Sequence, residues 1–596
     1  MDRTAFALHA FPGAKGAPPD ETSSNAGVSC ASPPPVTGRR ELNTTGLTLM
    51  TTPSPHRTAD VLARRLYDAG CRLAFGMPGG EVLTLVDALE RAGIRFVLCK
   101  HENAAAFMAE GAWHRTGAPG ILVATVGPGA LNGVNAVANA QQDRVPLIVL
   151  AGCVDADEAQ TYTHQVLDQT QVFRPITKAS FTLNTGAACV IADKAVGIAT
   201  EGRPGPVHID VPITVAVAPA AHTIPARRTD AAPLVPAPDV LAEMRAHLAR
   251  AERPIMIVGV DALNQGFDTR RSDMSAQLLT FAETFGVPVI TTYKAKGLLA
   301  EDHPLALGGA GLSPKADSIL LPLVHKADLI IGLGYDPIEM RTGWRDFYYP
   351  GIQTMIDITA EPNHHYMHQA RINVIANCSA TLTAMSDGVT PRDTWGTGEV
   401  VEAKAALAQA FPTDDAWGPA AVIDTCRSVL PRDTLATADS GAHRILLSQM
   451  WQCFEPRGLM QSSALCTMGC AIPLAMGAQV ADPDRTVVSF SGDAGFLMVA
   501  GELSTAAELG LKTIFVVFVD ASLALIELKQ RQRQLSNAGV DFAKHDFAAM
   551  GRAFGGAGHT VTSRAELTEA LESTQKADTF TVIAAVIDRG AYDGRI

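Results

Sequence analysis

Short, uninterrupted runs of aliphatic and β-branched residues recur along the chain, and segments with helical periodicity separate them. Strands that are apolar on both faces are typical of parallel sheets covered by helices on each side. The alternation therefore predicts an α/β fold made of mostly parallel sheets. The stretches that we interpret as strands lie at 95–100, 120–125, 146–152, 206–212, 253–263, 287–297, 327–337, 353–359, 434–441, 486–493, 513–520 and 580–588.

These strands fall into three blocks. A chain of 596 residues exceeds what a single hydrophobic core usually serves, so several domains are expected. A connector rich in Pro and Ala at 218–238 separates the first block from the second, and the second ends in polar sequence near 386–400. We predict three α/β domains of similar size, at 50–222, 235–390 and 415–596.

The first 49 residues differ from the rest. They are rich in Pro, Gly and Ser and show no apolar periodicity, which predicts a disordered extension at 1–49. They lack the apolar stretch of about 7–15 residues that marks a secretory signal. We interpret Met50 as the natural start of the protein.

Charge and hydropathy exclude several classes of partner. The net charge is −13, and Lys and Arg do not cluster as a nucleic-acid surface would require. No apolar run reaches the roughly 18 residues that span a bilayer, so we expect no membrane partner. The ten cysteines lie scattered among apolar neighbours, without C-x-x-C pairs. This pattern predicts reduced thiols in a cytoplasmic protein.

Two carboxylates follow two consecutive strands of the third block. Asp493 stands between Gly492 and Gly495 after the strand at 486–493, and Asp520 ends the next strand. Glycine turns at the carboxyl ends of parallel strands let backbone N–H groups approach a phosphate. A carboxylate there would repel the phosphate unless a divalent cation lay between them, so the pair suggests Mg²⁺ and a diphosphate. The alternative is that both residues only cap helices or turns.

This stretch resembles the thiamine-diphosphate motif, whose usual form is Gly-Asp-Gly followed at a distance by Asn-Asn. Here Ala494 replaces the last glycine, and Val519 with Asp520 replaces the paired asparagines. A similar Val-Asp occurs in catabolic acetolactate synthases. The resemblance implies that Asp493, Asp520 and the main-chain oxygen of Ser522 bind Mg²⁺.

Other stretches are similar to the same superfamily. Glu102 matches the glutamate that hydrogen-bonds the cofactor's pyrimidine ring and favours the tautomer that acts as an internal base. Met468 matches the apolar residue between the two cofactor rings, although a Met in an apolar run is more often core. The resemblance implies cofactor contacts by Gly441, His443, Cys466 (through its carbonyl), Met468, Gly492, Asp493, Ala494, Gly495 and Asp520. It also implies that the three blocks are pyrimidine-binding, central and diphosphate-binding domains.

Within this superfamily, the sequence most resembles the acetolactate synthases. The segment around His164 and Gln165 is similar to their active-site segment, so we expect these two side chains near the reacting carbon, where they orient the substrate. Other stretches resemble the catabolic branch, so FAD is not expected. The implied activity is decarboxylation of pyruvate and ligation of the two-carbon unit to a second 2-oxo acid. Because the two cofactor-binding domains of a site come from different subunits in this superfamily, a homodimer or a dimer of dimers is implied.

Three alternatives remain open. A related 2-oxo-acid decarboxylase or carboligase, of the benzaldehyde-lyase or sulfoacetaldehyde-acetyltransferase kind, would keep the same cofactor residues. A non-catalytic paralogue is disfavoured because Glu102, Asp493 and Asp520 are all present. A nicotinamide or flavin oxidoreductase is disfavoured because the segment at 257–266 lacks the G-x-G-x-x-G turn. The anabolic branch has a tryptophan that selects the second substrate, and Lys529 stands at that position here. The identity of the acceptor 2-oxo acid therefore stays open.

Overall fold

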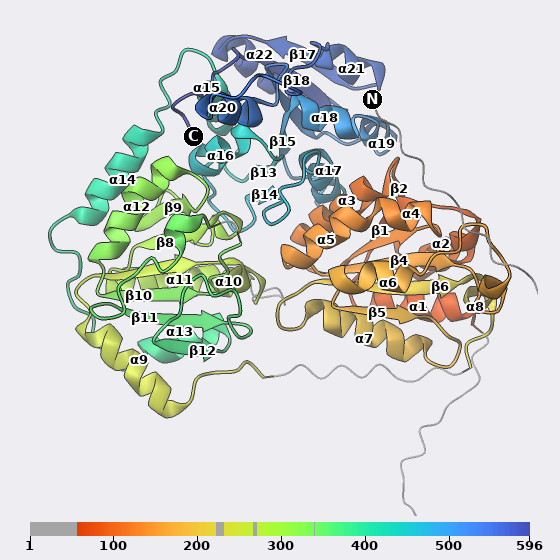
Figure 1. Cartoon of the computed structure of the whole chain (residues 1–596), viewed down its shortest axis with the longest axis horizontal. Helices are drawn as coiled ribbons and strands as arrows, with labels where there is room; N and C mark the ends of the chain where they lie inside the picture. Colours follow the sequence, from red (N-terminus) through yellow and green to blue (C-terminus); the bar gives the residue numbers. More distant parts are fainter. Residues whose placement is uncertain (1–55, 222–231, 266–270, 339) are drawn as a thin grey trace, which may run out of the picture. The chain divides into compact units, whose positions relative to one another are not determined.

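The computed structural model describes residues 56–221, 232–265, 271–338 and 340–596, so the predicted extension at 1–49 lies outside the described residues. Three six-stranded sheets form the framework, and every strand pair in them is parallel (Figure 1). The predicted α/β class is confirmed. None of the described helices has the length and hydropathy needed to span a bilayer.

The N-terminal sheet has the strand order β2-β1-β3-β4-β6-β5. Its strands are β1 (Leu73–Met77), β2 (Arg95–Leu98), β3 (Gly120–Ala124), β4 (Leu147–Cys153), β5 (Ala179–Thr182) and β6 (Pro206–Pro212). Its helices are α1 (Thr58–Asp68), α2 (Leu83–Ala92), α3 (Glu102–Thr116), α4 (Pro128–Asn132), α5 (Val134–Gln142), α6 (Gln169–Phe173), α7 (Ala188–Thr200) and α8 (Ile213–Val217). One face of the sheet packs with α1, α2 and α7 in a closed apolar core.

The central sheet has the order β12-β11-β10-β7-β8-β9. Its strands are β7 (Pro254–Val258), β8 (Val289–Thr292), β9 (Ala306–Ala310), β10 (Leu329–Leu333), β11 (Thr354–Thr359) and β12 (Ile372–Ile375). Its helices are α9 (Pro238–Arg250), α10 (Val260–Asn264), α11 (Arg271–Phe285), α12 (Pro314–Lys326), α13 (Cys378–Ser386) and α14 (Glu399–Ala410). Separate apolar cores lie on its two faces.

The C-terminal sheet has the order β14-β13-β15-β16-β18-β17. Its strands are β13 (Leu435–Ala438), β14 (Leu459–Gln461), β15 (Val487–Gly492), β16 (Ile514–Val519), β17 (Ala557–Val561) and β18 (Thr581–Val586). Its helices are α15 (Pro419–Val429), α16 (Ala442–Met450), α17 (Ala471–Ala481), α18 (Asp493–Val499), α19 (Glu502–Glu508), α20 (Ala524–Gln532), α21 (Phe547–Ala553) and α22 (Arg564–Thr574). The adjacent pair β15 and β16 carries the two strand-end carboxylates.

Each of the twelve predicted strand stretches contains a strand, whereas six further strands were missed. The missed strands are β1, β5, β9, β12, β14 and β17, and five of them lie at sheet edges. They are three to five residues long and contain Gly or polar residues, as in the β9 sequence ALGGA. Edge strands need not be apolar on both faces, so continuous hydrophobicity does not reveal them. The nine described cysteines are free, and most are buried, as expected.

A single apolar core joins the N-terminal and C-terminal sheets through α3 and α17. The two helices meet at glycines: a Cβ at Gly477 would lie 1.9 Å from the carbonyl oxygen of Met108, and one at Gly111 would lie 2.2 Å from that of Leu474. Backbone-to-backbone approach of this kind tolerates no side chain at either position. The two domains therefore depend on these glycines for their packing.

We expect Gly477→Ala to destabilise the protein by about 1–3 kcal/mol, because the added methyl group forces α3 and α17 apart. Gly501→Ala is the matched control, since a Cβ at Gly501 meets no atom within 4 Å. Thermal unfolding of both variants checks this expectation. Equal midpoints for the two variants would contradict the close-packing account.

Candidate active site

A cavity of about 120 Å³ opens at the carboxyl edge of the C-terminal sheet. Strand ends and the helix starts that follow them line it, as expected for a ligand site in a parallel α/β sheet. Of the residues predicted from the sequence, the cavity brings together Gly441, His443, Met468, Gly492, Asp493, Ala494, Gly495, Asp520 and Ser522. Residues from four separate stretches thus converge on one site.

The two carboxylates of the site are held by backbone N–H groups. Asp493 Oδ2 accepts from the N–H of Asp520 (3.2 Å) and of Ala521 (2.7 Å), and its Oδ1 accepts from that of Ala494 (2.8 Å). Asp520 Oδ1 accepts from the N–H of Ser522 (3.1 Å). These bonds fix both carboxylates at the carboxyl ends of β15 and β16.

Burial and the nearby charge of Asp493 together raise the pKa of Asp520 to about 7. Burial also raises the pKa of Asp493, against the opposing effect of its three N–H donors. A buried and a partly buried carboxylate that disfavour each other's charge attract a cation. Among the described residues no group of three or more His, Cys, Asp or Glu side chains surrounds a common point. A metal here would take the two carboxylates together with main-chain or ligand oxygens.

His443 presents a ring nitrogen to the same cavity. The residue is buried, and burial lowers its pKa to about 4, so the ring is neutral at physiological pH. Its Nε2 has no hydrogen-bond partner among the described residues. Gly441 and Gly492 lie against the ring, where a Cβ at Gly441 would come within 2.7 Å of it. A buried ring nitrogen without a partner is costly unless a ligand satisfies it.

The turn that contains Cys466 and Met468 has an unusual backbone. Cys466 has a φ of 51°, its side chain is exposed, and its thiol donates to the carbonyl of Ser463 (3.1 Å). Met468 lines the cavity, whereas Cys466 does not. Asp439 accepts from the N–H of Gly469 (2.7 Å) and so holds the end of the turn. The role predicted for the Cys466 carbonyl stays a prediction.

Glu102 lies in the N-terminal domain at the start of α3. Its side chain is buried, with 4% of the residue exposed, and its Oε2 accepts from the amide of Asn132 (3.0 Å). Gly129 packs closely against it, since a Cβ there would lie 2.9 Å from Glu102 Oε1. Gln165 has a φ of 57° and lies beside Gly127 in the same loop region, while His164 is exposed.

The chain does not bring the two halves of the predicted site together. Every residue that lines the C-terminal cavity lies between Ser440 and Tyr592, and none of the described residues of the N-terminal domain is among them. Glu102, His164 and Gln165 are thus not among the residues that line the cavity with Asp493 and Asp520.

The sequence analysis missed two residues of this region. Asp439 is fully buried after β13, and burial raises its pKa to about 7. Like Asp493, Asp439 stands at the end of a predicted strand, so the sequence could have identified it. Tyr592 lines the cavity from the last residues of the chain and lies near both carboxylates. No pattern in the sequence singles out Tyr592.

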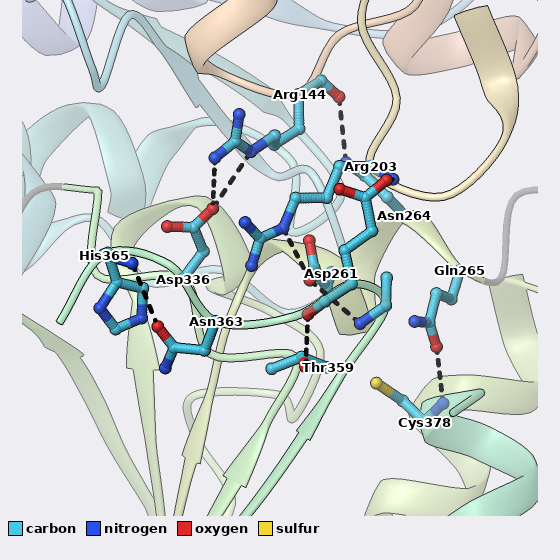
Figure 2. A network of polar contacts seen from close by, with 12 residues as sticks. Arg144, Arg203, Asp261, Asn264, Gln265, Asp336, Thr359, Asn363, His365 and Cys378 are labelled. Carbon is cyan, nitrogen blue, oxygen red and sulfur yellow. Dashed lines mark hydrogen bonds and ion pairs between the residues drawn. The ribbon is translucent and has the colours of Figure 1, made fainter. Parts of the chain in front are cut away.

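The carboxyl edge of the central sheet carries a different arrangement (Figure 2). Asp261 follows β7 and Asp336 follows β10, and two arginines of the N-terminal domain reach them. Arg144 donates to Asp336 Oδ2 (2.9 and 3.1 Å), and Arg203 lies 3.5 Å from Asp261 Oδ2. Burial raises the pKa of Asp261 to about 6, against the opposing effect of Arg203. The chain's own ion pairs thus occupy the place where a parallel sheet commonly binds a ligand.

Models of three protein domains match the chain in sequence. They are the N-terminal TPP binding domain (residues 56–172), the central domain (241–385) and the C-terminal TPP binding domain (439–585) of thiamine pyrophosphate enzymes. Thiamine pyrophosphate is another name for thiamine diphosphate. The three matches fall on the three sheets described above.

Curated relatives match over most of their length. The acetolactate synthase of Bacillus subtilis is 29% identical over 546 residues, which cover 89% of this chain and 93% of the relative. The catabolic acetolactate synthase of Raoultella terrigena is 28% identical over 89% of this chain and 95% of the relative. A probable acetolactate synthase large subunit of Methanocaldococcus jannaschii is 30% identical over 89% of this chain and 92% of the relative. With the cavity and its residues described above, these matches show that the chain belongs to the acetolactate synthase family of thiamine pyrophosphate enzymes.

Proposed function

We propose that the protein is a thiamine-diphosphate- and Mg²⁺-dependent acetolactate synthase-type enzyme. It decarboxylates pyruvate and joins the two-carbon unit to a second 2-oxo acid. The observation that carries this proposal is the cavity in which Asp493, Asp520 and the buried Nε2 of His443 face one space. We also propose domain boundaries at 50–222, 235–390 and 415–596 and a cytoplasmic location.

The residues present fit the cofactor and the metal. Asp493, Asp520 and the main-chain oxygen of Ser522 are oxygen ligands of the kind that Mg²⁺ prefers. His443 lines the same cavity, and the glycines beside its ring leave room for a diphosphate. Met468 lines the same cavity, where it would support the cofactor's rings.

When bound, thiamine diphosphate supplies an acidic carbon and an electron sink for decarboxylation. Glu102 would hold the cofactor's pyrimidine nitrogen by a hydrogen bond and so favour the tautomer that acts as an internal base. Asn132 donates to Glu102 Oε2, which leaves Oε1 for the ring nitrogen. His164 and Gln165 would orient the 2-oxo acid.

We propose that two copies of the chain complete each site. The N-terminal half-site and the C-terminal cavity are separate within the chain, so a second copy would bring Glu102 to the cavity. Exposed apolar side chains flank both halves, namely Leu131, Val166 and Leu167 near the first and Met498 and Ile526 near the second. Such patches are typical of surfaces covered by a partner.

FAD is not part of the proposal. The carboxyl edge of the central sheet holds the Arg144–Asp336 and Arg203–Asp261 pairs (Figure 2). A ligand that separated the partners of these pairs would leave buried charges uncompensated. The related 2-oxo-acid decarboxylases and carboligases stay the second candidate, since they share the cofactor residues. Lys529 is exposed on α20, which favours the interpretation that it faces solvent.

With pyruvate, thiamine diphosphate and Mg²⁺, we expect acetolactate as the main product, identified by mass spectrometry. Glu102→Gln should lower the rate by about 10²-fold or more, because an amide cannot set the tautomer by a carboxyl hydrogen bond. Glu569→Gln, at an exposed glutamate of α22, is the matched control and should keep the wild-type rate. Acetaldehyde as the only product would favour the second candidate instead.

Co-expression of two inactive variants tests the shared site. Glu102→Gln and Asp493→Asn damage different half-sites, so mixed dimers would contain one intact site. With random pairing we expect about a quarter of the wild-type activity in the mixture. If the mixture is as inactive as each variant alone, each chain completes its own site.

A further inference from the structure

The turn that joins β14 to α17, at 462–470, is held by side chains of the other two domains. Asp143, at the end of α5, is 1% exposed and accepts two backbone hydrogen bonds from this turn. Its Oδ2 accepts from the N–H of Ser463 (2.9 Å) and its Oδ1 from that of Ala464 (2.8 Å). One carboxylate thus satisfies two consecutive N–H groups of the segment that leads to Cys466 and Met468.

Lys294 of the central domain completes the arrangement. Its Nζ lies 3.0 Å from Asp143 Oδ2 and donates to the carbonyl oxygen of Gln461 (3.1 Å), directly before the turn. The side chains of Asp143 and Lys294 are 0% and 9% exposed. In a buried pair of this kind the loss of either partner leaves an uncompensated charge, which is strongly unfavourable.

Two further contacts fix the start of the same turn. Ser462 donates its hydroxyl to Asn139 of α5 (2.6 Å) and accepts from the N–H of Thr467 (2.9 Å). The cavity left beside this group measures about 10 Å³, too small for more than about one water molecule. The turn therefore has little freedom to adopt another shape, and Cys466 is held at its positive φ of 51°.

Arg144, next to Asp143 in the sequence, binds elsewhere. It pairs with Asp336, and its carbonyl oxygen accepts from Asn264 (3.1 Å) (Figure 2). The two neighbouring residues thus make different contacts. Arg144 joins the N-terminal domain to the central domain, whereas Asp143 binds the C-terminal turn. This separation supplies a matched control, because Asp336 makes a buried interdomain ion pair in which its hydrogen bonds go to Arg144, whereas Asp143 accepts directly from the turn.

We propose that Asp143 and Lys294 are positioning residues for the cofactor: their buried pair fixes the 462–468 backbone so that Cys466 and Met468 meet the pyrimidine side of the cofactor. The two residues act through the turn and touch no reacting atom. The link to the cofactor rests on the proposed function, whereas the control of the turn by the pair does not.

The test compares Asp143→Asn, Lys294→Met and Asp336→Asn with the wild type. Amide hydrogen exchange at Ser463 and Ala464 reports the turn without any reaction. We expect exchange to rise about tenfold or more in Asp143→Asn, because the amide can accept only one of the two N–H groups, and to rise in Lys294→Met. Asp336→Asn should stay within about twofold of the wild type, although it breaks a comparable pair.

Calorimetric titration with thiamine diphosphate at saturating Mg²⁺ gives the second readout. We expect the dissociation constant to rise about tenfold in Asp143→Asn and to stay unchanged in Asp336→Asn. Unchanged exchange at Ser463 and Ala464 overturns the proposal, and if Asp143→Asn does not fold, Lys294→Met decides. Faster exchange with unchanged affinity overturns the positioning role. A wild type that binds no thiamine diphosphate refutes the proposed function, while the exchange data still decide whether the pair fixes the turn.

Discussion

Two acidic side chains at adjacent strand ends are the constraint around which the C-terminal domain is organised. Parallel pairing of β15 with β16 places Asp493 and Asp520 at one edge of the sheet, and backbone N–H groups then fix both carboxylates in a partly buried site. Their proximity and burial make the doubly charged state unfavourable, as the raised pKa of Asp520 indicates. A divalent cation between the two carboxylates would relieve that cost, which is the basis of the proposed Mg²⁺ site.

The rest of the chain holds this edge in a defined geometry. Glycine contacts between α3 and α17 join the N-terminal and C-terminal domains at backbone distance. Buried ion pairs then connect the N-terminal domain to the central domain, with Asp143 meeting Lys294 and Arg144 meeting Asp336. Lys294 also donates to the carbonyl oxygen of Gln461 in the C-terminal domain. Small residues thus determine how close the domains come, and charged pairs determine which surfaces meet.

Much of this architecture was predictable from the sequence, because central strands of parallel sheets are apolar on both faces. The strand-end position of Asp493 and Asp520 followed from the same pattern, and the structure places both on one cavity. Five of the six edge strands were missed, since edge strands need only one apolar face and two of those missed, β9 and β17, contain glycines. Tyr592 and the Asp143–Lys294 pair depend on contacts between distant segments, which no local pattern encodes.

The measurement that tests the account most directly is the affinity for thiamine diphosphate, determined by calorimetric titration under two conditions. One titration contains Mg²⁺, and the other contains a chelator and no Mg²⁺. If Asp493 and Asp520 hold the cofactor through a cation, removal of the cation should weaken binding by about a hundredfold or more, because two carboxylates would then face the diphosphate directly. Equal affinity in the two conditions would contradict the account.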